Sequence, residues 1–197
     1  MSASSPRAWQ LMLSGRRLDL LNPASDDIEA EYIAHGLSRV ARWNGQTKGP
    51  HAFSVAQHSL LVENIFSVLA PSASYGDRLA ALLHDAPEYV VGDMISPFKA
   101  VIGGDYKAVE ARLLAAIYNR FNLPSPSTTA LTSAIKEADR IAACHEAVTL
   151  AGFKEEDALM IFGKPPVDLS FINELLTPIS SENSKTAFLH HLSKLKG

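Results

Sequence analysis

Apolar residues recur along most of the chain at the three-to-four-residue spacing of an amphipathic helix. The stripes predict helices over residues 26–43, 53–70, 77–91, 105–121 and 128–150, and shorter helices near 155–162, 168–176 and 181–196. No segment shows the strict alternation of apolar and polar residues that marks a half-buried strand ladder. The pattern therefore predicts an all-α fold, a helical bundle of about six to eight helices.

Two local signals refine the helix predicted over residues 77–91. Ser74 with Asp77 three residues later resembles the box of side chains that starts a helix. Pro87 lies inside the apolar stretch ALLHDAPEYVVGD, residues 81–93. Because proline has no backbone N–H to donate and clashes with the preceding turn, the helix should end or bend near Asp85 or Ala86.

The chain has the organisation of one domain. Its 197 residues suit a single domain, residues 1–197. Residues 1–25 read as an extended lead-in, in which LDLLNP is either a short strand or a packed loop. Residues 26–150 form the core, and residues 151–197 add C-terminal helices.

Composition narrows the class of protein and its surroundings. Apolar residues make up 47% of the chain and charged residues 20%, with a formal net charge of −3. This charge argues against polymeric nucleic acid as a partner, although it leaves room for a local basic pocket. Cys144 is the only cysteine, which favours a reducing compartment. Residues 1–15 do not read as a signal peptide, and no apolar run approaches membrane-spanning length. We therefore expect a cytoplasmic protein with no membrane association.

Three of the predicted apolar helices carry polar residues where packing alone would favour leucine or alanine. These residues are His58, the pair His84–Asp85, and Asp139. An ionised aspartate among apolar residues costs several kcal/mol unless something pairs with it. Taken singly, each has an ordinary explanation, as a core histidine bonded to a carbonyl or a solvated aspartate. Taken as a set, they predict a site for one divalent metal ion.

The mixture of ligand atoms indicates which ions would suit such a site. Two imidazoles and two carboxylates fit manganese, cobalt, iron or zinc, whereas magnesium prefers more oxygen ligands. Adjacent residues on a helix diverge by about 100°, so His84 and Asp85 share a target only where the helix is ending. Pro87 supplies a reason for that ending.

These residues resemble the HD-domain superfamily of metal-dependent phosphohydrolases. The superfamily's histidine, His–Asp pair and distant aspartate are matched by VAQHSLLV, LLHDAPE and KEADRIAA. AHGLSRVARW and GDMISPFK are similar to the bacterial 5′-deoxynucleotidase branch, and SVAQHSLLV also resembles phage and bacterial hydrolases of deoxynucleotides. The likeness covers roughly residues 26–150. It implies the all-α HD fold, with His58, His84, Asp85 and Asp139 as metal ligands.

The implied activity is hydrolysis of a small nucleotide, most simply a deoxynucleoside 5′-monophosphate. Four protein ligands leave one or two positions open on an octahedral ion, where hydroxide becomes available near neutral pH. Glu88 lies three residues after Asp85, on the same side if the helical turn persists, and is the candidate proton carrier. Asp93 matches a second acidic residue of the branch. The alternatives are an exposed helix-end glutamate and a turn-capping aspartate.

Candidate substrate-binding residues follow from the same likeness and from charge. Arg42 either forks onto phosphate oxygens or is a surface cation. Trp43 either packs on the sugar, crowding a 2′-hydroxyl, or plugs the core. His35 either reaches the phosphate or has a structural role. Lys99 could add positive potential near the metal, as could Lys48, Lys136 and Arg140, each of which is otherwise a solvated cation.

A few residues depart from the family pattern or fall outside it. Gln57 precedes the first ligand histidine, where nucleotidases of this branch often carry an acid. His145 lies six residues after Asp139 and so on another face, which excludes it as a ligand. We expect His190 and His191 to be solvated, and Cys144 to be a small buried filler.

Several readings of the function stay open on sequence alone. A deoxynucleoside triphosphate triphosphohydrolase would use the same ligands, and pocket length would separate it from a monophosphatase. An HD fold that senses a nucleotide without turning it over is the rival from another class, disfavoured because all four ligands and Glu88 are present. A purely structural helical bundle is the remaining reading. Many members of the superfamily are dimers, which by analogy favours a homodimer.

Overall fold

The computed structural model describes residues 7–95, 98–99, 101, 104–125, 127–166 and 170–196, and the fold is all-α. The prediction of six to eight helices is confirmed, with eight α-helices among these residues. The helices are α1 Ala30–Leu37, α2 Val55–Leu69, α3 Tyr75–Leu82, α4 Glu88–Val91, α6 Gly104–Arg120, α7 Thr129–Thr149, α8 Glu155–Phe162 and α9 Ser181–Leu195. Short 3-10 helices are η1 Ser25–Asp27, η2 Arg42–Gly45 and η3 Ser170–Leu176, and the strands are β1 Trp9–Leu11 and β2 Arg17–Asp19.

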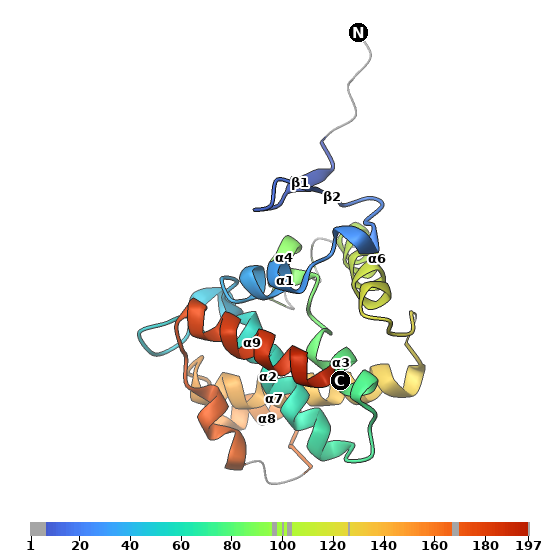
Figure 1. Ribbon diagram of the computed structural model, residues 1–197. Coiled ribbons are helices and arrows are strands. Elements are labelled where there is room, and N and C mark those ends of the chain that lie inside the picture. Colours follow the sequence, from blue (N-terminus) through green and yellow to red (C-terminus); the bar gives the residue numbers. More distant parts are fainter. Residues whose placement is uncertain are drawn as a thin grey trace.

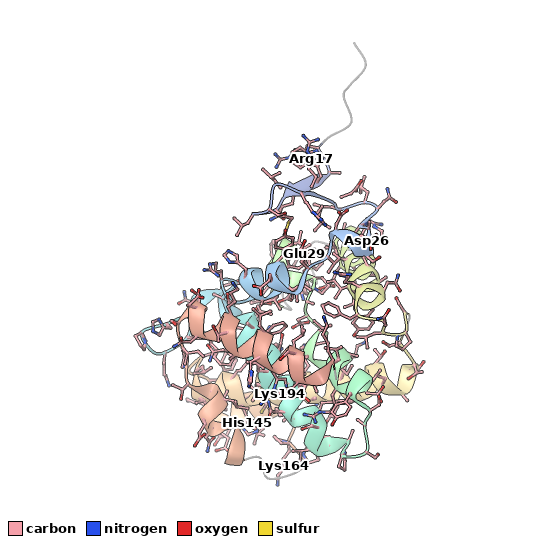
Figure 2. All side chains as sticks on the ribbon, in the orientation of Figure 1. Arg17, Asp26, Glu29, His145, Lys164 and Lys194 are labelled. Carbon is pink, nitrogen blue, oxygen red and sulfur yellow. The ribbon has the colours of Figure 1, made fainter. Side chains whose placement is uncertain are left out.

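The lead-in forms a small antiparallel hairpin at the N-terminal end of the molecule, beside α4 and α6 (Figure 1). Gln10 of β1 stands opposite Leu18 of β2, and Leu18 is fully buried against the helical core. The start of LDLLNP is thus the end of a strand. Arg17 on the hairpin lies at the opposite end of the molecule from Lys164, which comes after α8 (Figure 2).

Helix α2 is the centre of the bundle and packs against α7, α3 and α9 (Figure 1). The Ser54 side chain caps its first turn by accepting a hydrogen bond from the backbone N–H of Gln57. Leu61 and Ile65 are among its fully buried side chains. Because α7 crosses next to it, residues from the two helices meet although they lie far apart in sequence.

The helix predicted over residues 26–43 is interrupted, which corrects the sequence pattern. The regular helix α1 ends at Leu37, and the chain turns before the short η2. At Gly36, just before this end, a Cβ would lie 2.7 Å from the Cβ of Tyr89 on α4. A glycine here lets α4 approach α1 closely. Trp43 therefore does not continue the stripe of α1.

The helix predicted over residues 77–91 starts and bends as expected. Ser74 and Asp77 form the complete capping box at the start of α3. Helix α3 ends at Leu82, and α4 starts after Pro87 at Glu88. The bend thus falls at residues 83–87, and it carries the His–Asp pair.

The C-terminal elements pack on the core. Helix α8 has the predicted bounds, and η3 provides the described part of the helix predicted near 168–176, since residues 167–169 lie outside the described chain. Helix α9 packs against α1, α2 and α3. Among the described residues, no helix is both long and apolar enough to cross a lipid bilayer.

Glu63 joins three of these helices from a fully buried position on α2. One carboxylate oxygen accepts from Arg78 Nε of α3 at 2.6 Å, and the other lies 2.5 Å from His191 Nε2 of α9. His191 was expected in solvent, so this expectation is wrong: its imidazole is partly buried against Glu63. Burial alone would raise the pKa of Glu63, but His191 and Arg78 outweigh it and hold the pKa below its usual value.

We expect Glu63→Gln to destabilise the fold by roughly 2–4 kcal/mol at pH 7. The loss is moderated because Arg78 and His191 can both reach solvent. A carboxylate with a lowered pKa stabilises the folded state above its unfolded pKa of about 4.5, and this contribution is lost as the pH falls through the folded pKa. Urea denaturation at pH 7 and pH 4 should show a smaller difference from wild type at pH 4. An equal difference at both values would contradict this account.

Candidate metal centre

Two histidine rings from different elements point one nitrogen each at the same place. His58 lies in the first turn of α2, and its Nδ1 donates to Glu146 Oε1 at 2.5 Å. His84 lies in the bend after α3, and its Nδ1 donates to the Ala81 carbonyl at 2.8 Å. The two ring centroids are 5.4 Å apart. In the neutral ring, an acceptor on Nδ1 holds the proton there, so that the Nε2 lone pair would be available to a metal ion.

Both Nε2 atoms are buried and make no hydrogen bond. This observation bears on whether the residues fit a metal ion. A buried polar atom without a partner is costly, so such atoms call for an explanation. Carboxylate oxygens lie near His58 Nε2, at 3.4 Å for Asp85 and 3.1 Å for Asp139, yet neither has hydrogen-bond geometry. Lone pairs and carboxylates that converge without bonding to one another are what a cation site requires.

Three of the four predicted ligands form one group, and Asp85 lies next to its two histidines. Ligand atoms of His58, His84 and Asp139 all lie within 4.8 Å of one another. Asp85 Oδ2 joins them at 3.2 Å from His84 Nε2 and 3.4 Å from His58 Nε2. This mixture of two nitrogens and two carboxylates fits manganese, cobalt, iron or zinc. The donor set thus meets the chemical requirement for one divalent ion.

The electrostatics of the two aspartates favour their ionised forms. Burial would raise the pKa of Asp85, but His84 and His58 outweigh it and hold the pKa well below its usual range. The pKa of Asp139 is also lowered, because the close approach of the His58 ring outweighs the opposing effects of burial and Asp85. Both groups are therefore carboxylates, as metal ligands must be.

The backbone explains how the neighbours His84 and Asp85 share one target. Helix α3 stops at Leu82, and Leu83 has φ −97° and ψ 8°, outside the helical region. The pair then sits on a tight turn that leads through Pro87 into α4. The expectation that the helix ends at this pair is confirmed, and the ending removes the divergence that a continuous helix would impose.

A cavity of about 530 Å³ opens beside the ligands, between α6 and α7. All the candidate ligands except the one on α2 line it, together with Lys99, Lys107 and Lys136. Apolar side chains such as Leu114 and Ile135 form the remaining wall. The volume is within the range of sites for small molecules, which combine apolar walls with a few charged groups.

Glu88 lies behind this cavity and does not line it. Its side chain is 1% exposed, Oε2 has no hydrogen-bond partner, and Oε1 lies 3.5 Å from Lys99 Nζ. Burial, together with the charges of Asp85 and Asp93, raises the pKa of Glu88 to about 9, against the opposing effects of Arg42 and Lys99. The raised pKa favours the neutral acid form of Glu88, and Lys99 connects this side chain to the cavity.

Arg42 and Trp43 do not line the cavity beside the ligands, so their predicted role in substrate binding stays a prediction. Arg42 is 13% exposed and pairs with Glu146 Oε2 at 3.3 Å and Asp93 Oδ2 at 3.2 Å. The Trp43 indole N–H donates to Glu146 Oε2 at 2.9 Å. Its ring packs near Phe153, with centroids 5.6 Å apart. In the structure Trp43 is thus a partly buried residue that packs near Phe153, and Asp93 is the partner of Arg42.

The remaining residues considered from the sequence lie away from the cavity beside the ligands. His35 lies on α1 and lines a second cavity, of about 510 Å³, under the hairpin. Lys48 and Arg140 do not line the cavity beside the ligands, and Arg140 pairs with Glu137 at 2.5 Å. His145 (labelled in Figure 2) is not in the group of candidate metal ligands, in agreement with the prediction that it is not a ligand.

Gln57, which replaces the acid common in the nucleotidase branch, turns away from the metal centre. Its amide donates to the Thr177 carbonyl at 2.9 Å and accepts from the Ile179 N–H at 3.2 Å. Gln57 thereby fastens the segment between η3 and α9 to α2. It does not brace His58.

Glu146 takes that bracing position, and sequence reasoning missed it. The residue is fully buried on α7, seven positions after Asp139. Seven positions are two helical turns, so the two acidic residues share one face, and this spacing could have identified Glu146. The wall lysine Lys107 was also missed, because nothing near it in sequence relates it to the ligands.

Comparison with known proteins adds one close relative. No family model matches the chain. An uncharacterized protein from Rhodobacter capsulatus is 54% identical over 187 residues, which covers 94% of this chain and 95% of the relative. An identity of this size over nearly the full length of both chains means that they share one fold and one ancestry. The chain therefore belongs to the same family as this Rhodobacter capsulatus protein.

Proposed function

We propose that the protein is a metal-dependent phosphohydrolase of the HD-domain superfamily that cleaves a phosphoester of a small nucleotide. The leading substrate is a deoxynucleoside 5′-monophosphate. One observation carries the proposal: two buried imidazole nitrogens without hydrogen-bond partners converge with Asp139, and Asp85 lies 3.2–3.4 Å from both nitrogens, at the edge of a cavity. The order of the ligands, on α2, on the bend after α3 and on α7, agrees with the superfamily motif.

The residues around the cavity suit this chemistry. A divalent ion held by His58, His84, Asp85 and Asp139 would polarise the phosphoryl group and make hydroxide available near neutral pH. Lys99 and the other wall lysines attract the phosphate oxygens, and the apolar wall takes the sugar and base. Glu88 is the proposed source of the proton for the leaving alkoxide, and Lys99, which lines the cavity and contacts Glu88 Oε1, would pass a proton on and regain one from Glu88. We also propose that the protein acts in the cytoplasm.

A product assay tests the proposal. Purified protein with manganese or cobalt is incubated with each deoxynucleoside mono- and triphosphate, and ion-exchange chromatography resolves the products. We expect nucleoside and inorganic phosphate from monophosphates. Nucleoside with tripolyphosphate would replace the proposal by a triphosphohydrolase. Binding of a nucleotide without turnover would replace it by a sensor.

Two lysines that line the cavity, Lys107 and Lys136, favour a deoxynucleoside triphosphate as a second candidate substrate. Lys99 pairs with Glu88 at 3.5 Å and with Glu110 at 3.8 Å. In the part of the chain that the structure describes, no ion pair involves Lys107 or Lys136, so both can bind an anion. Lys136 stands one turn before Asp139 on α7, which directs it toward the phosphate held at the ligands.

We expect the double variant Lys107→Gln/Lys136→Gln to lower kcat/KM at least about tenfold, since a hydrogen bond to a charged group contributes roughly 1.5–3 kcal/mol. Lys194→Gln on the exposed face of α9 is the matched control and should leave kcat/KM unchanged. An equal loss for mono- and triphosphates means that the lysines hold the cleaved phosphate. A larger loss for triphosphates means that they hold distal phosphates. No loss would mean that they do not face the substrate.

A further inference from the structure

Glu146 is a buried carboxylate at the junction of the metal centre and the turn η2. Its side chain is 0% exposed. Oε1 accepts from His58 Nδ1, and Oε2 accepts from both Arg42 Nε and Trp43 Nε1. One carboxylate therefore satisfies three donors from α2 and η2. A buried anion with this many partners holds its place firmly.

We propose that Glu146 is a positioning residue of the metal centre: it keeps the proton of His58 on Nδ1, so that the Nε2 lone pair faces the ion. Arg42 and Trp43 serve this purpose by fixing Glu146. The inference rests on the metal centre of the proposed function and deepens it. A metal-bound histidine is commonly oriented in this way by a carboxylate on its other nitrogen, which also raises its basicity.

The backbone of η2 gives independent support. Trp43 has φ 56° and ψ 30°, and Asn44 has φ 51° and ψ 33°, both left-handed. Asparagine tolerates this region, but a tryptophan there costs on the order of 1–3 kcal/mol. The strained turn places the indole N–H on the same oxygen as the Arg42 guanidinium. Contacts of the ring with Phe153 and Phe162 offset the cost.

The charges around Glu146 are arranged to keep it anionic. Its two oxygens face three N–H donors, one from His58 and one each from Arg42 and Trp43, and the Arg42 guanidinium is a permanent cation. Arg42 reaches Asp93 with its other arm, so this cation is itself paired twice. The result is a fixed anion directly behind the ring of His58, on the side away from the ligand position.

Replacing Glu146 by glutamine separates charge from shape. An amide offers one acceptor and one donor group where the carboxylate offers two acceptors. Arg42 and Trp43 present two donors on the Oε2 side, against one from His58, so the amide oxygen should turn toward them. The amide N–H then faces His58 Nδ1, which must accept. The ring proton moves to Nε2 and blocks the lone pair that would bind the ion.

We expect Glu146→Gln to weaken metal binding roughly ten- to a hundredfold, measured by competition with a chromophoric chelator for zinc or cobalt. Glu137→Gln is the matched control, an exposed Glu-to-Gln change on the same helix, and should bind like wild type. Thermal melting in EDTA reports the fold without metal. A merely structural role predicts a lower melting temperature with unchanged affinity, which would overturn the inference.

A second variant keeps the test decisive if Glu146→Gln does not fold. Trp43→Phe keeps an aromatic ring beside Phe153 and Phe162 but removes the N–H donor with the pyrrole half of the indole, so it should weaken metal binding severalfold. Wild-type affinity in Trp43→Phe would then overturn the inference, as would a wild-type protein that binds no metal. Weaker binding in the variants, combined with no hydrolysis of any substrate by the wild type, would support the inference and refute only the phosphohydrolase.

Discussion

Asp85→Asn removes the turnover of the proposed enzyme and weakens metal binding more than roughly a hundredfold, while the helical circular dichroism signal persists. The expected loss exceeds that of changes outside the ligand set, which cost about ten- to a hundredfold. The amide keeps the size of the side chain but loses the negative charge that faces both histidine nitrogens at 3.2–3.4 Å. The fold should survive, because the side chain is 22% exposed and lies on a turn between helices.

A control variant distinguishes the loss of a metal ligand from general effects of an Asp-to-Asn change. Asp157→Asn, on the exposed first turn of α8, makes the same chemical change away from the cavity and should retain both turnover and affinity. Metal affinity is measured by chelator competition, and turnover by phosphate release. If Asp85→Asn kept wild-type turnover, the ligand assignment would be wrong.

The candidate metal ligands could be picked out from sequence because each one breaks a strong local pattern. His58, the His–Asp pair and Asp139 are polar residues at positions where the helical period demands apolar ones. Pro87 marks the one place where two adjacent residues can share a target. Each of these signals can be recognised within a single helix. The residues then meet in the fold because α2 and α7 pack directly against each other.

The role of Arg42 and Trp43 could not be predicted from the same kind of pattern. Apolar spacing extends the first helix through Trp43, but the helix ends at Leu37. Trp43 and Asn44 instead form a left-handed turn, and tryptophan is among the residues least expected in that conformation. The turn is stabilised by Glu146, more than 100 positions later in sequence. A tertiary contact at that separation overrides local preference.

Glu146 and the wall lysines show the same limit. His58 and Glu146 are 88 positions apart, so only the packing of α2 on α7 shows that they touch. Lys107 enters the cavity because α6 faces α7 across it, which no local pattern indicates. Sequence periodicity reports which face of a helix is buried, but it does not report which other helix covers that face.

Glu88→Gln should lower kcat about a hundred- to ten-thousandfold, the usual contribution of a positioned proton donor. The reason is that Glu88 is a buried neutral acid with a pKa of about 9, and an amide of the same shape has no proton to give. Metal affinity should stay near the wild-type value, because Glu88 is not among the atoms that converge on the ligand position. A variant that loses metal together with activity would point to a structural role.

Glu88→Gln should also change how folding stability depends on pH, in a direction that the raised pKa of Glu88 determines. Glu88 has a folded pKa of about 9 and an ordinary pKa of 4.5, so between these values the folded state holds a proton that the unfolded state releases. Folding stability therefore falls as the pH rises through this window, by at most about 1.4 kcal/mol per pH unit. Glutamine does not titrate, so in EDTA the stability of Glu88→Gln relative to wild type should increase by about 2–3 kcal/mol from pH 6 to pH 8.

Comparing urea denaturation of both proteins at the two pH values isolates this effect, since all other titrating groups are common to them. Asp85, Asp93, Arg42 and Lys99 are the charged groups that set the pKa of Glu88, and all are retained in the variant. A difference that stays constant with pH would show that Glu88 is ionised in the folded protein. It would then be a carboxylate paired with Lys99, suited to accept a proton from the attacking water rather than to donate one to the leaving group.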